Sequence, residues 1–150
     1  MTHILGIVLA EPSCVAVSGE SDEDVRAIGK EAKGLIGKTA KYTKIISPIY
    51  EGKIANPRLA VLMMKEFFRR IDVKKSELRR AQVLFSIPCG LPEPCLEEYV
   101  SLAEECGLKK VYFVEQPYLA ALGSGAILSD TDPVFCLDIG GGVANAAVIS

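Results

Sequence analysis

An aspartate and three consecutive glycines close to residue 150 are the residues best suited to chemistry. They lie in the stretch "CLDIGGGVANAAVIS", where one apolar run leads to Asp138 and a second apolar run follows Gly140, Gly141 and Gly142. Glycines have no Cβ, so their backbone can approach a ligand closely and successive N–H groups can point into one concavity. Such a turn suits phosphate oxygens, and Asp138 is placed to hold a hydrated Mg²⁺ ion. A tight β-hairpin with a preceding aspartate is the alternative.

Other kinds of catalytic site have few residues to draw on. The only histidine is His3, and no C-x-x-C spacing occurs among the five cysteines, which are Cys14, Cys89, Cys95, Cys106 and Cys136. This argues against a zinc site and against Cys/His or Ser/His/Asp catalysis. The "GSG" of residues 123–125 falls within or after a predicted helix instead of following a strand. We therefore interpret it as close packing of that helix against a neighbour and not as a dinucleotide fingerprint.

Length and composition indicate one ordinary globular domain. The chain has 150 residues, of which 49% are hydrophobic and 24% charged, and a formal net charge of −2. This composition excludes a disordered chain and gives no overall signal for nucleic acid or for a membrane surface. No apolar run reaches the roughly 18 residues that span a bilayer, and Glu11-Pro12 cuts short the first apolar stretch, unlike a signal peptide. We expect a cytoplasmic protein.

The first half of the chain predicts strands followed by helices. Residues 4–17 are β-branched and apolar and predict two strands around Glu11-Pro12. The helical spacing of apolar residues predicts helices over 25–37 and over 57–71, the second beginning at Pro57. Residues 44–56 alternate around Glu51-Gly52, which indicates a strand or short hairpin, and residues 72–80 form a basic, polar linker.

In the second half, strands alternate with helices. Strands are predicted over 81–88, 109–115 and 133–139, and helices over 93–107 and 116–128. Alternation of this kind is typical of parallel pairing with right-handed crossovers, and therefore of the α/β class.

Five segments, in order, resemble the MreB family of bacterial actins. D-x-G-G-G between two apolar strands is similar to the second phosphate loop of the actin, sugar kinase and heat-shock chaperone superfamily. The segments that follow MreB patterns are "GIVLAEPSCVAV", "AIGKEAKGLIGKT", "ISPIYEGKIAN", the stretch from "IPCGLPEP" to "VEQPYLAALGSG", and "DIGGGVANAAVIS". The resemblance implies the first half of an actin-like (ribonuclease-H-like) fold, an α/β fold with a mixed sheet and flanking helices. It assigns residues 1–24 and 57–136 to subdomain IA, 25–56 to IB, and 137–150 to the start of IIA.

The same resemblance implies a function. It implies a cytoskeletal protein that binds ATP and Mg²⁺ and takes part in cell-shape determination and in organising cell-wall synthesis. Gly140, Gly141, Gly142 and Val143 would bind the nucleotide phosphates, and Asp138 would face Mg²⁺ through water. The implied partners are further copies or a full-length MreB-like protein in filaments, the cytoplasmic face of the membrane and cell-wall synthesis proteins, with no nucleic acid.

Several departures from the family pattern concern ATP turnover. The first phosphate loop, D-[LI]-G-T-A-N-T, and the second half of the fold are not in the sequence, so we expect one wall of the nucleotide cleft and an unpaired sheet edge. The water-orienting Glu of the family is replaced by Gln116, with Glu115 one residue away, and the family's T-T-E after the glycines is Val143, Ala144 and Asn145. Glutamine cannot act as a base, and valine forms no hydrogen bond.

Three interpretations follow from these departures. The first is an ATP-binding MreB-like cytoskeletal protein. The second is a non-catalytic MreB-like fragment that acts as a filament-interaction module, and we expect weak ATP binding without hydrolysis. The third is an FtsA-like or chaperone-like protein, which the MreB-like pattern continuing through residues 31–56 argues against.

A basic segment is the candidate for membrane contact. MreB proteins insert a short apolar loop before the strand that corresponds to residues 81–88, and the matching stretch here is "KKSELRR". Leu78 is its one apolar residue, and its four cations, which are expected to attract anionic lipid, are Lys74, Lys75, Arg79 and Arg80. A solvated linker is the alternative.

Overall fold

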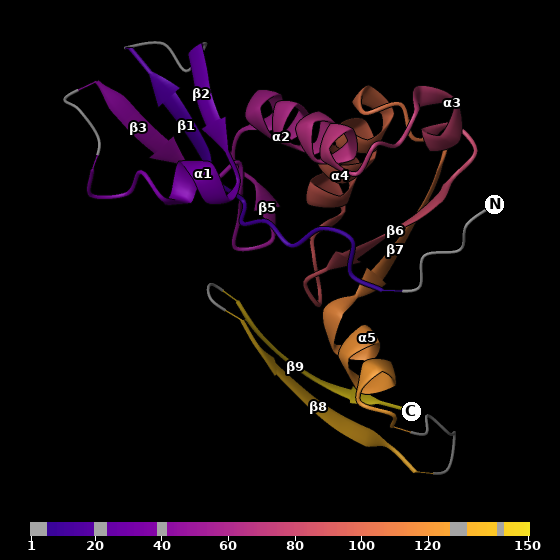
Figure 1. Ribbon diagram of the computed structural model, residues 1–150. Coiled ribbons are helices and arrows are strands. Elements are labelled where there is room, and N and C mark those ends of the chain that lie inside the picture. Colours follow the sequence, from indigo (N-terminus) through magenta and orange to yellow (C-terminus); the bar gives the residue numbers. More distant parts are fainter. Residues whose placement is uncertain (1–5, 20–23, 39–41, 127–131, 141–142) are drawn as a thin grey trace. The chain divides into compact units, whose positions relative to one another are not determined.

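The chain forms two compact units of mixed helices and strands (Figure 1). The computed structural model describes residues 6–19, 24–38, 42–126, 132–140 and 143–150. The first unit comprises residues 1–50 and 54–78, and the second comprises residues 51–53 and 79–150. Both contain helices and strands, in agreement with the predicted α/β class.

The first unit is built around a three-stranded antiparallel sheet with the order β2-β1-β3. The central strand β1 spans Val15–Ser18, while β2 spans Asp24–Ile28 and β3 spans Thr43–Ile46. Val15 and Val17 are fully buried and form the core with Leu59 and Met63 of helix α2. The β-branched side chains of β1 suit this position because they pack well on a pleated surface.

Helix α2, Pro57–Arg70, has clear signals at both ends. The Asn56 side chain accepts a hydrogen bond from the Leu59 N–H at 3.0 Å, and Pro57 occupies the first turn, where its missing N–H costs nothing. At the other end the Val73 N–H donates to the Phe68 carbonyl across a Schellman turn, with Asp72 at a φ of 55°. The helix predicted over residues 57–71 is confirmed.

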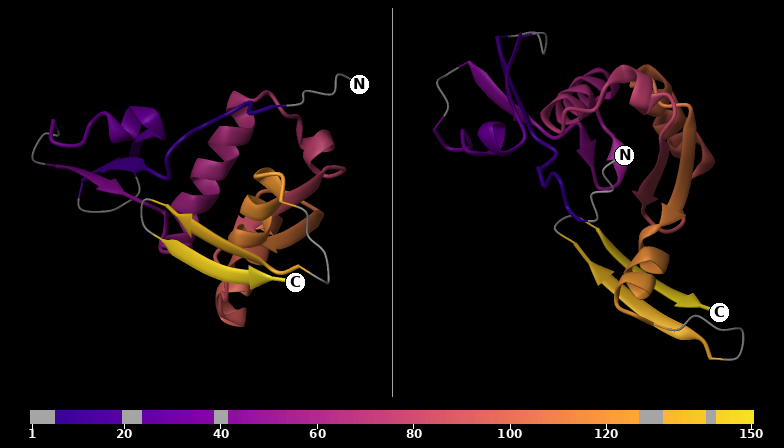
Figure 2. Two further views of the ribbon diagram at one scale, coloured as in Figure 1. Left: turned by 90° about the horizontal axis from the view of Figure 1, so that it is seen from below. Right: turned by 45° about the vertical axis from the view of Figure 1, so that its right-hand side comes forward.

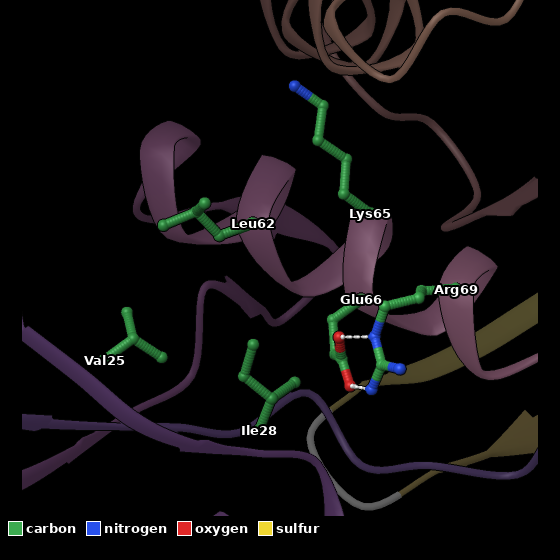
Figure 3. A pocket seen from close by; sticks show the side chains of 6 residues that line it. All are labelled: Val25, Ile28, Leu62, Lys65, Glu66 and Arg69. Carbon is green, nitrogen blue, oxygen red and sulfur yellow. Dashed lines mark hydrogen bonds and ion pairs between the residues drawn. The ribbon is translucent and has the colours of Figure 1, made fainter. Parts of the chain in front are cut away.

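Ion pairs fix the end of α2, and Figure 3 shows the one between Glu66 and Arg69. Both Arg69 and Arg70 donate hydrogen bonds to the Glu66 carboxylate at 2.7–3.0 Å. These bonds, with that from Arg69 the largest cause, lower the pKa of Glu66 to about 2. Arg70 also pairs with Glu11 at 3.2 Å and donates to the Ile28 carbonyl at 3.1 Å. The segment before β1 is thereby tied to the last turn of the helix.

Two predictions for the first unit are wrong. Residues 25–37 form strand β2 and the short helix α1, Lys30–Lys33, instead of one helix. Hydrogen bonding of β2 to β1 outweighs the helical spacing, and Gly29, at a φ of 73°, turns the chain between the two elements. Of the two strands predicted over residues 4–17, the described residues contain only β1. Pro12 lacks the N–H that a ladder requires.

The predicted turn at Glu51-Gly52 is confirmed. Strands β4, Ile49–Tyr50, and β5, Lys53–Ile54, pair around it. Glu51 and Gly52 have φ values of 50° and 70°, as a two-residue type I′ turn requires. The predicted linker at 72–80 is not entirely irregular, because it contains the single-turn helix α3, Lys75–Leu78.

The second unit begins with a parallel βαβ arrangement. Strands β6, Gln82–Ile87, and β7, Lys110–Glu115, pair in parallel, and helix α4, Glu93–Glu105, connects them. Phe85 and Phe113 stack with ring centroids 5.7 Å apart, and Tyr99 of α4 meets both rings edge-on. The Tyr99 hydroxyl donates to the Gly52 carbonyl at 3.1 Å. The predicted elements and their parallel pairing are confirmed here.

An antiparallel hairpin completes the second unit (Figure 2). Helix α5, Gln116–Gly123, packs against strands β8, Val134–Ile139, and β9, Ala144–Ile149. Within the described residues β8 pairs with β9 and not with β7, so the parallel pairing expected of this strand is wrong. The short connection makes the local hairpin the easier pairing to close.

The role predicted for "GSG" is also wrong. A Cβ placed on Gly123 would meet no atom within 4 Å, so α5 does not pack closely against a neighbouring element at this glycine. Gly125, at a φ of 82°, instead ends α5 in a Schellman turn, in which the Ala126 N–H donates to the Ala121 carbonyl at 3.1 Å.

Candidate functional site

Two of the predicted site residues, Glu115 and Gln116, lie where strands β6 and β7 end. The register pairs Ile87 with Glu115, so the chain leaves both parallel strands at the same edge. From β6 it continues into the Pro88-Cys89-Gly90 turn, and from β7 it enters α5 at Gln116. This edge of an α/β sheet is where ligand sites commonly lie.

Glu115 holds the turn that follows β6. Its Oε1 accepts a hydrogen bond from the Gly90 N–H at 3.0 Å, and its Oε2 accepts one from the Cys89 thiol at 3.6 Å. Desolvation, followed by the negative charge of Glu115, raises the pKa of Cys89, so the thiol stays protonated at neutral pH. The carboxylate next to Gln116 thus has a structural use, namely to position a backbone turn.

The Gln116 side chain is hydrogen-bonded to Asn145. Asn145 is 6% exposed and is the one buried polar or charged residue among those that the structure describes. The Asn145 Nδ2 donates to the Gln116 Oε1 at 2.8 Å, and the Asn145 Oδ1 accepts from the Cys89 N–H at 3.1 Å. One amide therefore links β9 to the start of α5 and to the turn after β6. A carboxylate at position 145 has no proton to donate to Gln116 at neutral pH.

Sequence reasoning missed this role of Asn145 and the participation of Cys89 and Gly90. It treated Asn145 only as the loss of a family glutamate. The signal that was available is the alternation of β9, in which Asn145 shares its face with Ala147 and Ile149. A polar residue in an inward-facing row needs hydrogen-bond partners.

The glycine-rich turn is the predicted hairpin. Strand pairing runs up to Ile139 and Ala144, and the Gly140 N–H donates to the Val143 carbonyl at 2.9 Å. This donor therefore closes the turn on itself. Gly141 and Gly142 lie outside the described residues, so the predicted phosphate concavity stays a prediction.

Asp138 meets the requirements of a magnesium ion held mainly by water and phosphate. Its cross-strand partner is Asn145, so its side chain is on the hairpin face that carries the amide pair. Mg²⁺ in phosphate sites typically takes one or two carboxylates and keeps several waters, which a single aspartate satisfies. No cluster of three or more potential metal ligands occurs in the part of the chain that the structure describes.

The segment predicted to contact a membrane presents its cations and not its leucine. Leu78 is 9% exposed, whereas Lys74, Lys75, Arg79 and Arg80 are all exposed. The Lys74 N–H donates to the Glu77 carboxylate at 2.9 Å, which caps α3. In the described ranges, no helix combines the length and apolar character needed to cross a membrane.

Comparison with known proteins places this arrangement in a family. The family profile described as "MreB/Mbl protein" matches residues 2–150. The chain belongs to the MreB/Mbl family. The resemblance found in the five sequence segments is thereby confirmed.

Members of the MreB/Mbl family with curated names are similar over almost the whole chain. Cell shape-determining protein Mbl of Bacillus subtilis is 34% identical over 145 residues. Cell shape-determining protein MreB of Escherichia coli strain K12 is 32% identical over 148 residues. Each match covers 97% of this chain and 43% of the relative, so the chain spans less than half the length of these proteins.

Solved structures of the MreB/Mbl family have the same fold. MreB5 of Spiroplasma citri bound to ADP superposes with a TM-score of 0.85 at 32% identity, covering 97% of this chain and 43% of that one. MreB5 bound to AMPPNP gives a TM-score of 0.85 at 31% identity, covering 93% and 41%. The predicted actin-like fold is confirmed for this part of an MreB chain.

Proposed function

We propose that this protein is a cell-shape protein of the MreB/Mbl family that joins actin-like assemblies without hydrolysing ATP. Support for the first part comes from relatives named as cell shape-determining proteins. Support for the second part comes from the pair formed by Gln116 and Asn145.

The amide pair is the observation that carries the proposal. Gln116 occupies the position at which the family resemblance implies a water-orienting glutamate, and its Oε1 is engaged by Asn145 at 2.8 Å. An amide has no basic group near neutral pH, so Gln116 cannot take a proton from an attacking water, and the bond from Asn145 occupies one of the two acceptor positions of its oxygen. The Glu115 carboxylate, one residue away, accepts from Gly90 and Cys89 and is thereby held at the turn after β6. Val143 adds no hydroxyl.

Nucleotide binding is a separate part of the proposal. MgATP or MgADP binds weakly, with its phosphates at Gly140–Val143 and its Mg²⁺ ion facing Asp138 through water. The two MreB5 structures, one bound to ADP and the other to AMPPNP, support adenine nucleotides as the ligand class. Bound magnesium would offset phosphate charge, while the residues of this chain supply only placement.

The proposed partners are filaments of this protein or of a full-length MreB-like protein, together with cell-wall synthesis proteins. The protein acts in the cytoplasm, at the inner face of the membrane. The four exposed cations between residues 74 and 80 support contact with anionic lipid, each worth about 1 kcal/mol near the surface. The burial of Leu78 favours electrostatic attachment over insertion of that side chain.

Phosphate release from MgATP tests the catalytic part. The wild-type chain is expected to release phosphate no faster than buffer. The matched variant is Gln116→Glu combined with Val143→Thr, which restores both lost groups. Glutamate at position 116 still accepts from the Asn145 Nδ2, so the fold is retained. Wild-type release above that of buffer, whatever the rate of the variant, would overturn the proposal.

Co-sedimentation tests the assembly part. The protein is expected to pellet with filaments of a full-length MreB-type protein and to stay in the supernatant without them. Calorimetry with MgATP is expected to give a Kd weaker than about 100 µM. Micromolar affinity, or absence from the filament pellet, would contradict the corresponding part.

A further inference from the structure

The two amides that link β9 to α5 have a fixed polarity. The Cys89 N–H can only donate a hydrogen bond, so the atom of Asn145 that meets it at 3.1 Å is the acceptor Oδ1. The other end of the same side chain is therefore the donor Nδ2, which meets Gln116 at 2.8 Å and selects its Oε1. A backbone N–H thus determines, through Asn145, which end of the Gln116 amide is left for other partners.

The end of Gln116 that is left is a pair of N–H donors. Its Nε2 has no hydrogen-bond partner among the residues that the structure describes. Gln116 is half-buried and begins α5, which packs against the β8–β9 hairpin (Figure 2). A half-buried donor without a protein partner favours a ligand that offers oxygen acceptors, because a polar group that loses water without gaining a partner costs free energy.

Asp138 supplies the opposite character beside the same amide pair. It is the cross-strand partner of Asn145, so the two Cβ atoms are about 4.5–5.5 Å apart. Within the described ranges, no hydrogen bond or ion pair engages its carboxylate. A phosphoryl group that carries Mg²⁺ complements both side chains, since its oxygens accept hydrogen bonds and its hydrated metal ion attracts a carboxylate.

The proposed binding mode puts Gln116 near the end of the phosphate chain. The phosphates lie at Gly140–Val143, and Asn145 follows Val143 by two residues, or about 7 Å of strand. The family resemblance implies a water-orienting group at position 116, and a water that attacks ATP lies in line with the terminal phosphate. A donor at this position therefore meets the γ-phosphate of ATP, for which ADP has no counterpart.

We infer that Gln116 donates from its Nε2 to the terminal phosphate of MgATP, and that the chain therefore binds MgATP more tightly than MgADP. This contact rests on the proposed function and deepens it, because a residue that does not activate water instead selects the triphosphate. Asn145 is a positioning residue for the contact, since it holds the oxygen of Gln116 and leaves the nitrogen for the ligand. Hydrogen bonds to charged acceptors are among the strong ones, so the preference for MgATP is expected to be at least about fivefold.

Titrations of the isotope-labelled 150-residue chain, followed by two-dimensional NMR, compare MgATP, MgADP and inorganic phosphate with magnesium chloride. The chain has two glutamines, Gln82 and Gln116, so the side-chain NH₂ signal of Gln116 is the one that disappears in Gln116→Met. This signal is expected to move with MgATP and much less with MgADP. Gln82→Met is the matched control, because Gln82 begins β6 at the end away from the site, and it is expected to keep the preference of the wild type.

Two variants separate the donor from its support. Gln116→Met keeps the length of the side chain but has no N–H, so it is expected to bring the affinities for MgATP and MgADP to within about twofold of each other. Asn145→Ala keeps Gln116 but no longer fixes its direction, so it is expected to lower the preference at least about twofold. The remaining signals of each spectrum show whether the fold is kept.

The results distinguish this contact from nucleotide binding as such. Equal wild-type affinities for MgATP and MgADP, or a preference that persists in Gln116→Met, would overturn the inference and leave the proposed nucleotide site in place. A Gln116 signal that moves with inorganic phosphate but not with MgATP would overturn it in favour of a site for free phosphate. Absence of binding by all three ligands would overturn the nucleotide part of the proposed function together with the inference.

Discussion

Removing the Asn145 side chain tests whether one buried amide holds the candidate site together. Asn145→Ala deletes the donor to Gln116 and the acceptor of the Cys89 N–H. Each hydrogen bond contributes about 0.5–1.5 kcal/mol net, and because Cys89 is exposed, water can replace the lost acceptor of its N–H. The loss of two such bonds is therefore expected to lower the free energy of unfolding by about 1–3 kcal/mol.

Amide hydrogen exchange measures the same effect locally. The Cys89 N–H is expected to exchange at least tenfold faster in Asn145→Ala, because its acceptor is gone. Gln116→Ala is the matched variant, since it removes the other partner of Asn145 and leaves the bond to Cys89 in place. It is expected to lower stability by about 1 kcal/mol with little change in Cys89 exchange.

The double variant completes the reasoning. Asn145→Ala and Gln116→Ala are expected to be non-additive by about 0.5–1.5 kcal/mol, because either substitution already removes the bond between them. Full additivity in urea unfolding, together with unchanged Cys89 exchange in Asn145→Ala, would refute the assignment of Asn145 as the link between α5, β9 and the turn.

Three further substitutions probe the scaffold. Glu66→Gln is expected to remove the pH-dependent contribution of Glu66 to stability. The folded pKa of Glu66, about 2, is below its unfolded value, so this contribution is complete above about pH 4.5 and is lost as the pH falls towards 2. Its size is about 1 kcal/mol, measured by urea unfolding against pH. Asp72→Gly relieves a positive φ at the end of α2 and should raise stability by about 0.5–1 kcal/mol in thermal unfolding, while Asp72→Val should lower it. Gly52→Ala places a Cβ against the Pro88 ring and should cost at least about 1 kcal/mol more than Gly37→Ala, which has a similar φ and open space around it.

Each of these expectations has a result that contradicts it. An acid profile that is the same in Glu66→Gln and the wild type would show that its ion pairs contribute nothing. Equal melting temperatures for Gly and Val at position 72 would remove the strain argument. Equal costs at positions 52 and 37 would show that the Pro88 contact yields freely.

Elements with strong local signals were predictable from the sequence. Helix α2 combines a capping Asn56, Pro57 at its first position and apolar residues at helical spacing, and all three signals lie within or next to the helix itself. Residues 25–37 carry a similar spacing, but Val25 pairs with Val17 of β1, a contact that no local pattern contains. Hydrogen bonding to β1, a tertiary contact, therefore makes the first part of that segment a strand.

The candidate site was predictable to a similar extent. The alternation of strands and helices placed Glu115 and Gln116 at a strand end, and the structure has them there. The bonds of Asn145 to Cys89 and Gln116 join residues 56 and 29 positions apart, so only the folded chain reveals them. A match to a family pattern shows which residue of the family is replaced, but not which contacts the new residue makes.

The ion pair between Glu11 and Arg70 has a consequence for biosynthesis. Its two residues are 59 positions apart, and the core partners of β1, Leu59 and Met63, also come late in the chain. At about 5–20 residues per second, a ribosome needs roughly 3–12 s to make the intervening segment. The side chains of Val15 and Val17 therefore lack their packing partners on α2 for several seconds during synthesis. The first unit is completed only when the end of α2 has been synthesised.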